Sequence, residues 1–249
     1  RLDFTVRDTD GDTASSSVAV NVAPPETVEL SNNGIPYQAS NDPENINGSV
    51  GNDTVQGGAG ADYIYGGSGD DVLLGNAGND VLYGDTGNDR IQGGLGVDRI
   101  QGGAGNDTLT GDIAGSPFAD VFAWSLSDQG TVGSGRAVDT ITDFSTAARA
   151  AGGDVLDLRD LLQGENTNGG VGNLVRYLDI DTSGADTVIR VSSTGNFSSN
   201  GTYASGSEDQ RIVLTGVNLR TDMGLSTNAG DQQVIQELLN RGKLLVDNS

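Results

Sequence analysis

The chain has 249 residues, of which 35 are acidic and 13 basic, so its formal net charge is −22 and its pI is near 4.1. This charge disfavours a nucleic acid or an anionic membrane as a partner. The absence of His and Cys excludes His-based catalysis, His or Cys metal sites, Ser-His-Asp and Cys-His nucleophiles and disulfide bonds. No apolar run approaches the roughly 20 residues of a membrane-spanning helix. Asp outnumbers Glu by 29 to 6, and this short carboxylate suits turns and hard cations.

The first residues predict a β-hairpin. Apolar and polar residues alternate in LDFTVRD and SSSVAVNV, on either side of the turn sequence DTDGDT. The pair resembles the last hairpin of an immunoglobulin-like repeat from a large bacterial adhesin, so residues 1–23 are assigned to the end of such a repeat. Residues 24–47 are interpreted as a linker and N-terminal cap, because Pro24 and Pro25 end the strand pattern. The turn contains three acidic residues that either bind calcium at a domain junction or cap an ordinary turn: Asp8, Asp10 and Asp12.

A nine-residue repeat follows from Gly48 to Gly111. The seven blocks read GSVGNDTVQ, GGAGADYIY, GGSGDDVLL, GNAGNDVLY, GDTGNDRIQ, GGLGVDRIQ and GGAGNDTLT. Each block has an Asp at its sixth position and an aliphatic residue two positions later. The aspartates are Asp53, Asp62, Asp71, Asp80, Asp89, Asp98 and Asp107, and the aliphatic residues are Val55, Ile64, Leu73, Leu82, Ile91, Ile100 and Leu109.

This spacing predicts a coil rather than a conventional sheet. A block provides a glycine-rich turn of six residues and a strand of three, whose middle side chain points inward. Two blocks complete a flattened coil of 18 residues, so each strand lies on the strand two blocks away. The aspartates then line two edges, with Asp53, Asp71, Asp89 and Asp107 on one and Asp62, Asp80 and Asp98 on the other.

The blocks resemble the GGxGxDxUx nonapeptides of RTX proteins, the hemolysin-type calcium-binding repeats. This resemblance implies a Ca²⁺-bound parallel β-roll with about five full sites between successive coils. Each Ca²⁺ takes six to eight oxygen ligands. Here the ligands would come from the seven aspartates, shared among the sites, and from carbonyl groups of the turns. The carbonyls assigned to this role are those of Gly51, Gly60, Gly69, Gly78, Gly87, Gly96 and Gly105. Without calcium, we expect a solvated acidic linker, because seven aliphatic side chains form a small core for so long a segment.

Residues 112–230 predict a small β-rich capping domain. Ala119–Leu162 resembles the C-terminal target domain of large RTX adhesins exported by type I secretion, with Phe144, Leu156 and Leu158 in a core that closes the coil. Three aspartates either complete a further calcium site or are solvated strand ends: Asp139, Asp143 and Asp154. Asp179 and Asp181 have the DxDxxG spacing of an isolated calcium site, but Arg190 stands where an EF-hand needs a carboxylate.

Residues 231–249 predict a short C-terminal helix. Asp231 is assigned as its cap and Gly242 as its end, and Val234, Ile235, Leu238 and Leu239 form its apolar stripe. In exported RTX proteins a segment of this kind is the address read by the ABC transporter of type I secretion. The resemblance implies that role for residues 231–249.

The fold predicted is therefore all-β, a calcium-bound parallel β-roll over residues 48–111 followed by the capping domain and helix. The function predicted is a non-enzymatic C-terminal module of a secreted, cell-surface adhesin, involved in cell adhesion and biofilm, whose calcium-induced folding is coupled to type I secretion. Its partners would be calcium, the ABC transporter and a neighbouring adhesin domain. Two alternatives stay open: a module that binds a surface glycan, or the export domain of a secreted hydrolase. The glycan would bind to an outward stripe that includes Tyr63, Tyr65 and Tyr83, which is otherwise a plain cross-strand aromatic ladder.

Overall fold

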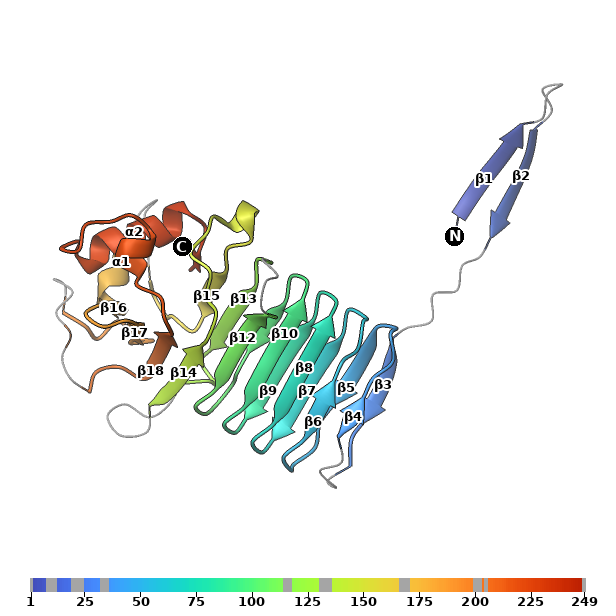
Figure 1. Ribbon diagram of the computed structural model, residues 1–249, viewed down its shortest axis with the longest axis horizontal. Coiled ribbons are helices and arrows are strands. Elements are labelled where there is room, and N and C mark those ends of the chain that lie inside the picture. Colours follow the sequence, from blue (N-terminus) through green and yellow to red (C-terminus); the bar gives the residue numbers. More distant parts are fainter. Residues whose placement is uncertain are drawn as a thin grey trace.

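The computed structural model describes residues 2–7, 13–18, 25–31, 36–113, 118–129, 136–165, 171–198, 203 and 206–247, the first two of these ranges by their backbone only. The protein is all-β, and its main body is a parallel β-solenoid to which two short helices are added at the C-terminal end (Figure 1). The predicted hairpin is present as β1 (Leu2–Arg7) and β2 (Thr13–Val18), which pair antiparallel. The turn that contains Asp8, Asp10 and Asp12 lies outside the described residues.

Successive repeats alternate between two parallel sheets, so each strand pairs with the strand two repeats away. Ile64, for example, lies opposite Leu82, and Tyr65 lies opposite Tyr83. This is the 18-residue coil that the nine-residue spacing predicts. One sheet contains β4 (Tyr37–Gln38), β6 (Thr54–Gln56), β8 (Val72–Ala77), β10 (Arg90–Leu95) and β12 (Thr108–Asp112); the other contains β3 (Glu26–Glu29), β5 (Glu44–Asn47), β7 (Tyr63–Ser68), β9 (Val81–Thr86) and β11 (Arg99–Gln101).

The solenoid begins before the glycine-rich repeats. The segment assigned to a linker and cap contributes β3, β4 and β5, which pair in parallel with the strands of the roll. Ile46 is fully buried opposite Ile64, and Glu44 donates its backbone N–H to Asp62. Glu44 and Ile46 therefore take the places that Asp and the inward aliphatic residue hold in each repeat.

Both sheets also continue past the last repeat, and the described residues between 112 and 247 share the core and the sheets of the solenoid. On one sheet β14 and then β18 extend the parallel ladder before β17 and β16 turn antiparallel, and on the other β13, β15 and β19 extend it. The strands are β13 (Val121–Ser125), β14 (Ala137–Ile141), β15 (Val155–Asp160), β16 (Leu178–Asp181), β17 (Thr187–Val191), β18 (Gln210–Leu214) and β19 (Leu244–Leu245).

The helices lie at the far end of the solenoid, near β16 and β18 (Figure 1). The predicted C-terminal helix is α2 (Asp231–Asn240), and its residues Val234, Ile235 and Leu238 are buried. Its cap is Gly230 rather than Asp231, since Gln233 Oε1 accepts the Gly230 N–H and Asp231 instead contacts Arg220. The other helices are α1 (Leu219–Asp222) and the 3₁₀ turns Arg149–Ala151 and Leu174–Arg176. No helix in the described part of the chain is long and apolar enough to cross a membrane.

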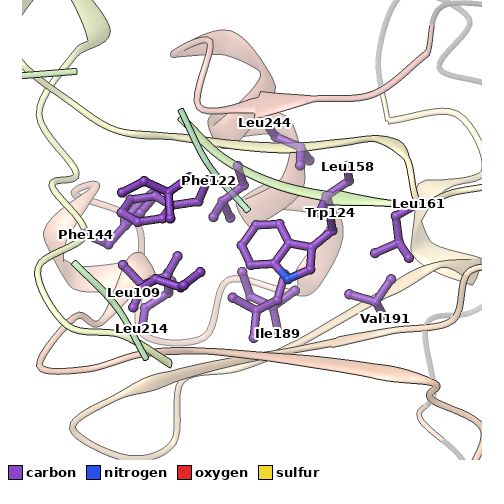
Figure 2. Close-up of a cluster of buried hydrophobic side chains, with 14 of the residues drawn as sticks. Leu109, Phe122, Trp124, Phe144, Leu158, Leu161, Ile189, Val191, Leu214 and Leu244 are labelled. Carbon is purple, nitrogen blue, oxygen red and sulfur yellow. The ribbon is translucent and has the colours of Figure 1, made fainter. Parts of the chain in front are cut away.

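One hydrophobic core runs from the N-terminal coil to the C-terminal region. The aliphatic residue of every repeat is inside it, and all seven are 0% exposed, as the alternation predicts. At the end of the roll the core widens around Trp124, which lies among Phe122, Leu158, Ile189 and other apolar side chains (Figure 2). Phe144, Leu156 and Leu158, the residues predicted to close the coil, all belong to this cluster.

Candidate metal centres

The repeat aspartates form two ladders along the edges of the solenoid. In each ladder, the backbone N–H of one Asp donates to Oδ1 of the Asp that follows it by 18 residues, one coil later. The structure brings together all five predicted pairs. The distances are 2.7 Å for Asp53–Asp71 and 2.8 Å for Asp62–Asp80, Asp71–Asp89, Asp80–Asp98 and Asp89–Asp107.

From Asp62 onward, the second oxygen of these carboxylates has no hydrogen-bond donor. Oδ2 is buried and unpartnered in Asp62, Asp71, Asp80, Asp89, Asp98, Asp107 and Asp120. None of these residues is more than 2% exposed. A buried charged oxygen without a partner costs free energy, so binding of a proton or a cation at each Oδ2 would be favourable. Because the same unpartnered oxygen recurs in every repeat from Asp62 to Asp107, the geometry fits a row of cations along each ladder.

From the second repeat onward, the first glycine of each repeat makes room for this carboxylate. A Cβ on Gly57 would lie 2.7 Å from Asp62 Oδ2 and 2.9 Å from the carbonyl oxygen of Gly75. The same collision recurs at Gly66, where Asp71 Oδ2 would be 2.4 Å away. Any side chain at this position would therefore displace the unpartnered oxygen. The carbonyl of the first glycine in the next coil faces the same space, which makes it an oxygen donor that the sequence analysis did not assign.

The fourth glycines, whose carbonyls were assigned as ligands, have a different environment. The carbonyl oxygen of Gly60 lies 1.8 Å from the place of a Cβ on Gly78, and that of Gly87 lies 1.7 Å from the place of a Cβ on Gly105. These carbonyls face the fourth glycine of the next coil. The signal for the first-position carbonyls was available, because glycine fills the first position of all seven blocks.

From the second repeat to the seventh, the second position of each turn has a left-handed backbone. Gly67 and Gly94 have φ angles of 98° and 121°, and Asn76 and Asp85 adopt 72° and 69° at the equivalent place. Asn and Asp tolerate this region better than other side chains. Asn76 and Asp85 therefore preserve the turn that positions the aspartates, whereas Ser49, the third departure from the motif, does not have a positive φ.

The raised pKa values of the repeat aspartates also favour the binding of a cation. Burial raises the pKa of Asp71 to about 6, and repulsion from Asp53 adds to the shift. Burial likewise raises the pKa of Asp98 to about 7 and that of Asp107 to about 8, with repulsion from Asp139 contributing at Asp107. In the described part of the chain no Lys or Arg forms an ion pair with a repeat Asp.

A hard cation would suit these oxygens, but side chains alone cannot complete its shell. No three acidic side chains among the described residues converge closely enough to hold a metal ion. Ca²⁺ takes six to eight oxygens from carboxylates, backbone carbonyls and water. Two ladder carboxylates and the glycine carbonyls of the turns are the donors that the geometry provides between successive coils.

Both ladders end in carboxylates that the chain itself satisfies. Asp53 Oδ2 accepts the backbone N–H and the hydroxyl of Ser49, at 2.7 and 2.8 Å. At the other end Asp139 Oδ2 accepts Trp124 Nε1 and Gln210 Nε2, and Asp154 Oδ2 accepts the Ser145 N–H at 2.7 Å.

The remaining sequence-predicted candidates are held by hydrogen bonds and ion pairs. Asp143 accepts the N–H groups of Gly111 and Asp112, one on each oxygen. Asp179 and Asp181 both bind Arg190, at 2.5 and 2.9 Å. Hydrogen bonds from Ser183 and Arg190 lower the pKa of Asp181 to about 2. Arg190 thus supplies the positive charge that an isolated calcium ion would otherwise bring.

Comparison with known proteins identifies the repeats. The family model of the RTX calcium-binding nonapeptide repeat matches residues 39–73, 47–82 and 83–113. This confirms that the chain contains RTX calcium-binding nonapeptide repeats. The solution structure of the AlgE6R3 subunit of Azotobacter vinelandii mannuronan C5-epimerase is similar with a TM-score of 0.35 and 20% identity, covering 86% of this chain and 84% of that one. The solution structure of the AlgE6R2 subunit of the same enzyme is similar with a TM-score of 0.34 and 18% identity, covering 87% of this chain and 95% of that one. No curated protein matches the chain.

Proposed function

We propose that the solenoid is a calcium-folded module, in which ions bind between successive coils along both aspartate ladders. The observation that carries this proposal is the row of buried carboxylate oxygens without donors, one in each repeat from Asp62 to Asp107. The RTX family match to residues 39–113 supports calcium as the ion.

The chain prepares each ion position through its own hydrogen bonds. The backbone N–H of one Asp fixes Oδ1 of the next, which leaves Oδ2 directed at the space beside the first glycine. Calcium, when bound, supplies the positive charge that offsets the repulsion between these carboxylates. Carboxylates one strand spacing of about 4.8 Å apart repel by about 0.9 kcal/mol per neighbour even at the dielectric constant of water. The calcium-free chain should therefore lose the roll, and ion binding should drive its folding.

We propose further that the chain is a non-enzymatic C-terminal module of a secreted bacterial adhesin. RTX repeat proteins are typically secreted by type I systems. The hairpin of β1 and β2 supports an adhesin repeat upstream of the roll. Residues 231–249 would be the address of the transporter, and the buried face of α2 means that this address is readable only before folding. Calcium-poor cytosol would keep the chain unfolded for export, and external calcium would fold it outside the cell.

A calcium titration of the full chain, followed by far-UV circular dichroism, tests the central part of this proposal. We expect little β signal from the roll in chelator and a cooperative gain as calcium rises. Magnesium at the same concentrations is the control and should act weakly, since it demands shorter bonds and strict octahedral geometry. A full β signal in chelator that calcium does not change would contradict the proposal. For export, deletion of residues 231–249 should abolish secretion by a type I system.

A glycan-binding surface is a second candidate function, favoured by one feature of the outer face. The rings of Tyr65 and Tyr83 stack with centroids 5.0 Å apart and planes 8° apart. Tyr83 also lines a hollow together with Asp85, Gln101 and Asp128. Aromatic rings beside carboxylates and amides suit a neutral sugar better than an acidic one. Loss of binding to a neutral-glycan array in Tyr65→Ala and Tyr83→Ala would support this function, whereas no binding by the wild-type chain would exclude it.

A further inference from the structure

One aspartate ladder continues beyond the last nonapeptide through a residue outside the repeat motif. The backbone N–H of Asp98 donates to Asp120 Oδ1 at 2.8 Å, the same contact that joins successive repeats. The Val121 N–H donates to the Asp98 carbonyl at 2.9 Å, and Ile100 lies opposite Phe122. Asp120 thus occupies the next rung, although it follows Asp98 by 22 residues instead of 18.

The carboxylate of Asp120 has the features of a repeat carboxylate. The residue is 0% exposed, and its Oδ2 has no hydrogen-bond donor. A Cβ on Gly111 would lie 2.3 Å from this oxygen, as a Cβ on Gly93 would lie 2.3 Å from Asp98 Oδ2. Gly111 therefore makes the same room for Asp120 that the first glycine of a repeat makes for its own Asp.

The other ladder ends differently. Asp139 takes the rung after Asp107, accepting its N–H at 3.0 Å. Its Oδ2, however, accepts Trp124 Nε1 at 2.7 Å and Gln210 Nε2 at 2.8 Å. Trp124 stands in the middle of the apolar cluster that ends the roll (Figure 2). Protein donors thus replace any need for a cation at this rung, whereas none of the described residues does so at Asp120.

A second unpartnered oxygen lies beside Gly111. Asp112 Oδ2 accepts the Phe118 N–H at 3.2 Å, but its Oδ1 is buried without a donor. Asp143 bridges the N–H groups of Gly111 and Asp112 and so holds this corner of the chain in place. The charges of Asp112 and Asp143 reinforce the effect of burial, which raises the pKa of Asp120 to about 7. This corner is therefore anionic, fixed and short of hydrogen-bond donors.

We infer that a divalent cation of calcium's size binds here, between Asp98 and Asp120, with backbone carbonyls and water completing its shell and the charge of Asp112 adding to the attraction. This would add an ion beyond those of the nonapeptides, on one edge of the solenoid only. The inference rests on the proposed function, because it assumes that the repeats themselves bind calcium. Its effect would be to couple the first coil of the C-terminal region to calcium-induced folding of the roll.

Calcium stoichiometry of the full chain, measured by native mass spectrometry and equilibrium dialysis, tests the inference. Asp120→Asn should bind one ion fewer than the wild type, and Asp112→Asn should bind one ion about tenfold more weakly or worse. Asp70→Asn is the matched control and should bind the full number, because its carboxylate is exposed and bonded to Asn88. Circular dichroism in calcium shows whether each variant has folded. If Asp120→Asn does not fold, the calcium binding of Asp112→Asn decides the test.

The outcomes separate this inference from the proposal on which it rests. A wild-type chain that binds no calcium would overturn both. A wild type that binds calcium, with Asp120→Asn and Asp112→Asn binding as many ions with the same affinities, would overturn only the added site.

Discussion

The first glycine of each repeat allows a sharp test, because an added methyl group has a defined place in the structure. A Cβ on Gly84 would lie 2.3 Å from Asp89 Oδ2 and 2.3 Å from the carbonyl oxygen of Gly102. Movement of both atoms is restricted, since Asp71 N–H holds Oδ1 of the Asp89 carboxylate at 2.8 Å and Gly102 directly follows the paired strand β11. The backbone of Gly84 is not in the left-handed region, so the effect of Gly84→Ala would be steric.

Overpacking a fixed core costs about 1–3 kcal/mol, and two collisions with restrained atoms place Gly84→Ala near the upper end, at about 3 kcal/mol. Urea denaturation of the full chain at saturating calcium should show this loss in the free energy of unfolding. One calcium ion should also bind more weakly, because the methyl group enters the space beside Asp89 Oδ2.

Gly51→Ala is the matched control in the same roll. A Cβ there would meet only Ser49 Oγ, at 3.9 Å, and the residue is not left-handed either. We expect no destabilisation and a gain of up to about 1 kcal/mol from the stiffer unfolded chain. Equal effects of the two substitutions, or an unchanged stability in Gly84→Ala, would refute the role assigned to the first glycine.

Three further predictions concern the ladder carboxylates. The folded-state pKa values of about 6 for Asp71 and about 8 for Asp107 lie above the ordinary 3.8, so the calcium-free fold binds more protons than the unfolded chain and loses stability as pH rises through this window. The chain in chelator should therefore gain β signal by circular dichroism between pH 8 and pH 5, and a signal that rises with pH would contradict this. Asp71→Asn should lower the affinity for two calcium ions by about tenfold or more in calorimetric titration, whereas Asp70→Asn should bind calcium as the wild type does. Equal titration curves for the two variants would contradict the pairing of Asp71 with both of its neighbours in the ladder. Trp124→Phe removes a donor to Asp139 and should lower the free energy of unfolding, measured in urea with calcium, by about 2 kcal/mol. An unchanged free energy would show that this hydrogen bond does not stabilise the Asp139 carboxylate at the end of the ladder.

Much of the solenoid could be predicted because its period is strict. A nine-residue spacing leaves one register in which every inward residue is aliphatic, and a slip of one residue would expose Ile64 and bury Tyr65. The structure has that register, and the stacked Tyr65 and Tyr83 follow from it. The pairing of aspartates across coils follows from the same count, without any knowledge of their hydrogen bonds.

The continuation of the ladder was harder to predict, because insertions break the period. Four extra residues separate Asp98 from Asp120, so the spacing no longer marks Asp120 as a rung. A shorter signal persists, since Asp120, Asp139 and Asp154 are each followed two residues later by a fully buried apolar side chain. Asp139 and Asp154 are candidates for a further calcium site from the sequence alone, and the Asp-x-apolar triplet would also have marked Asp120.

Other features depend on contacts between distant residues and have no local pattern. The Trp124 and Gln210 donors to Asp139 are 15 and 71 residues away from it in the sequence. Buried Lys243 bonds the carbonyl oxygens of Ser145 and Asp154 across still longer separations. Such contacts decide which carboxylates need a cation, and only the folded chain shows them.

The positions of ions in a crystal of the full chain grown with calcium would test the central claim most directly. The account predicts anomalous scattering peaks between successive coils on both edges, each about 2.3–2.6 Å from the Oδ2 atoms of the repeat aspartates. An ordered roll in the same crystal, with those oxygens bound to no ion, would contradict it.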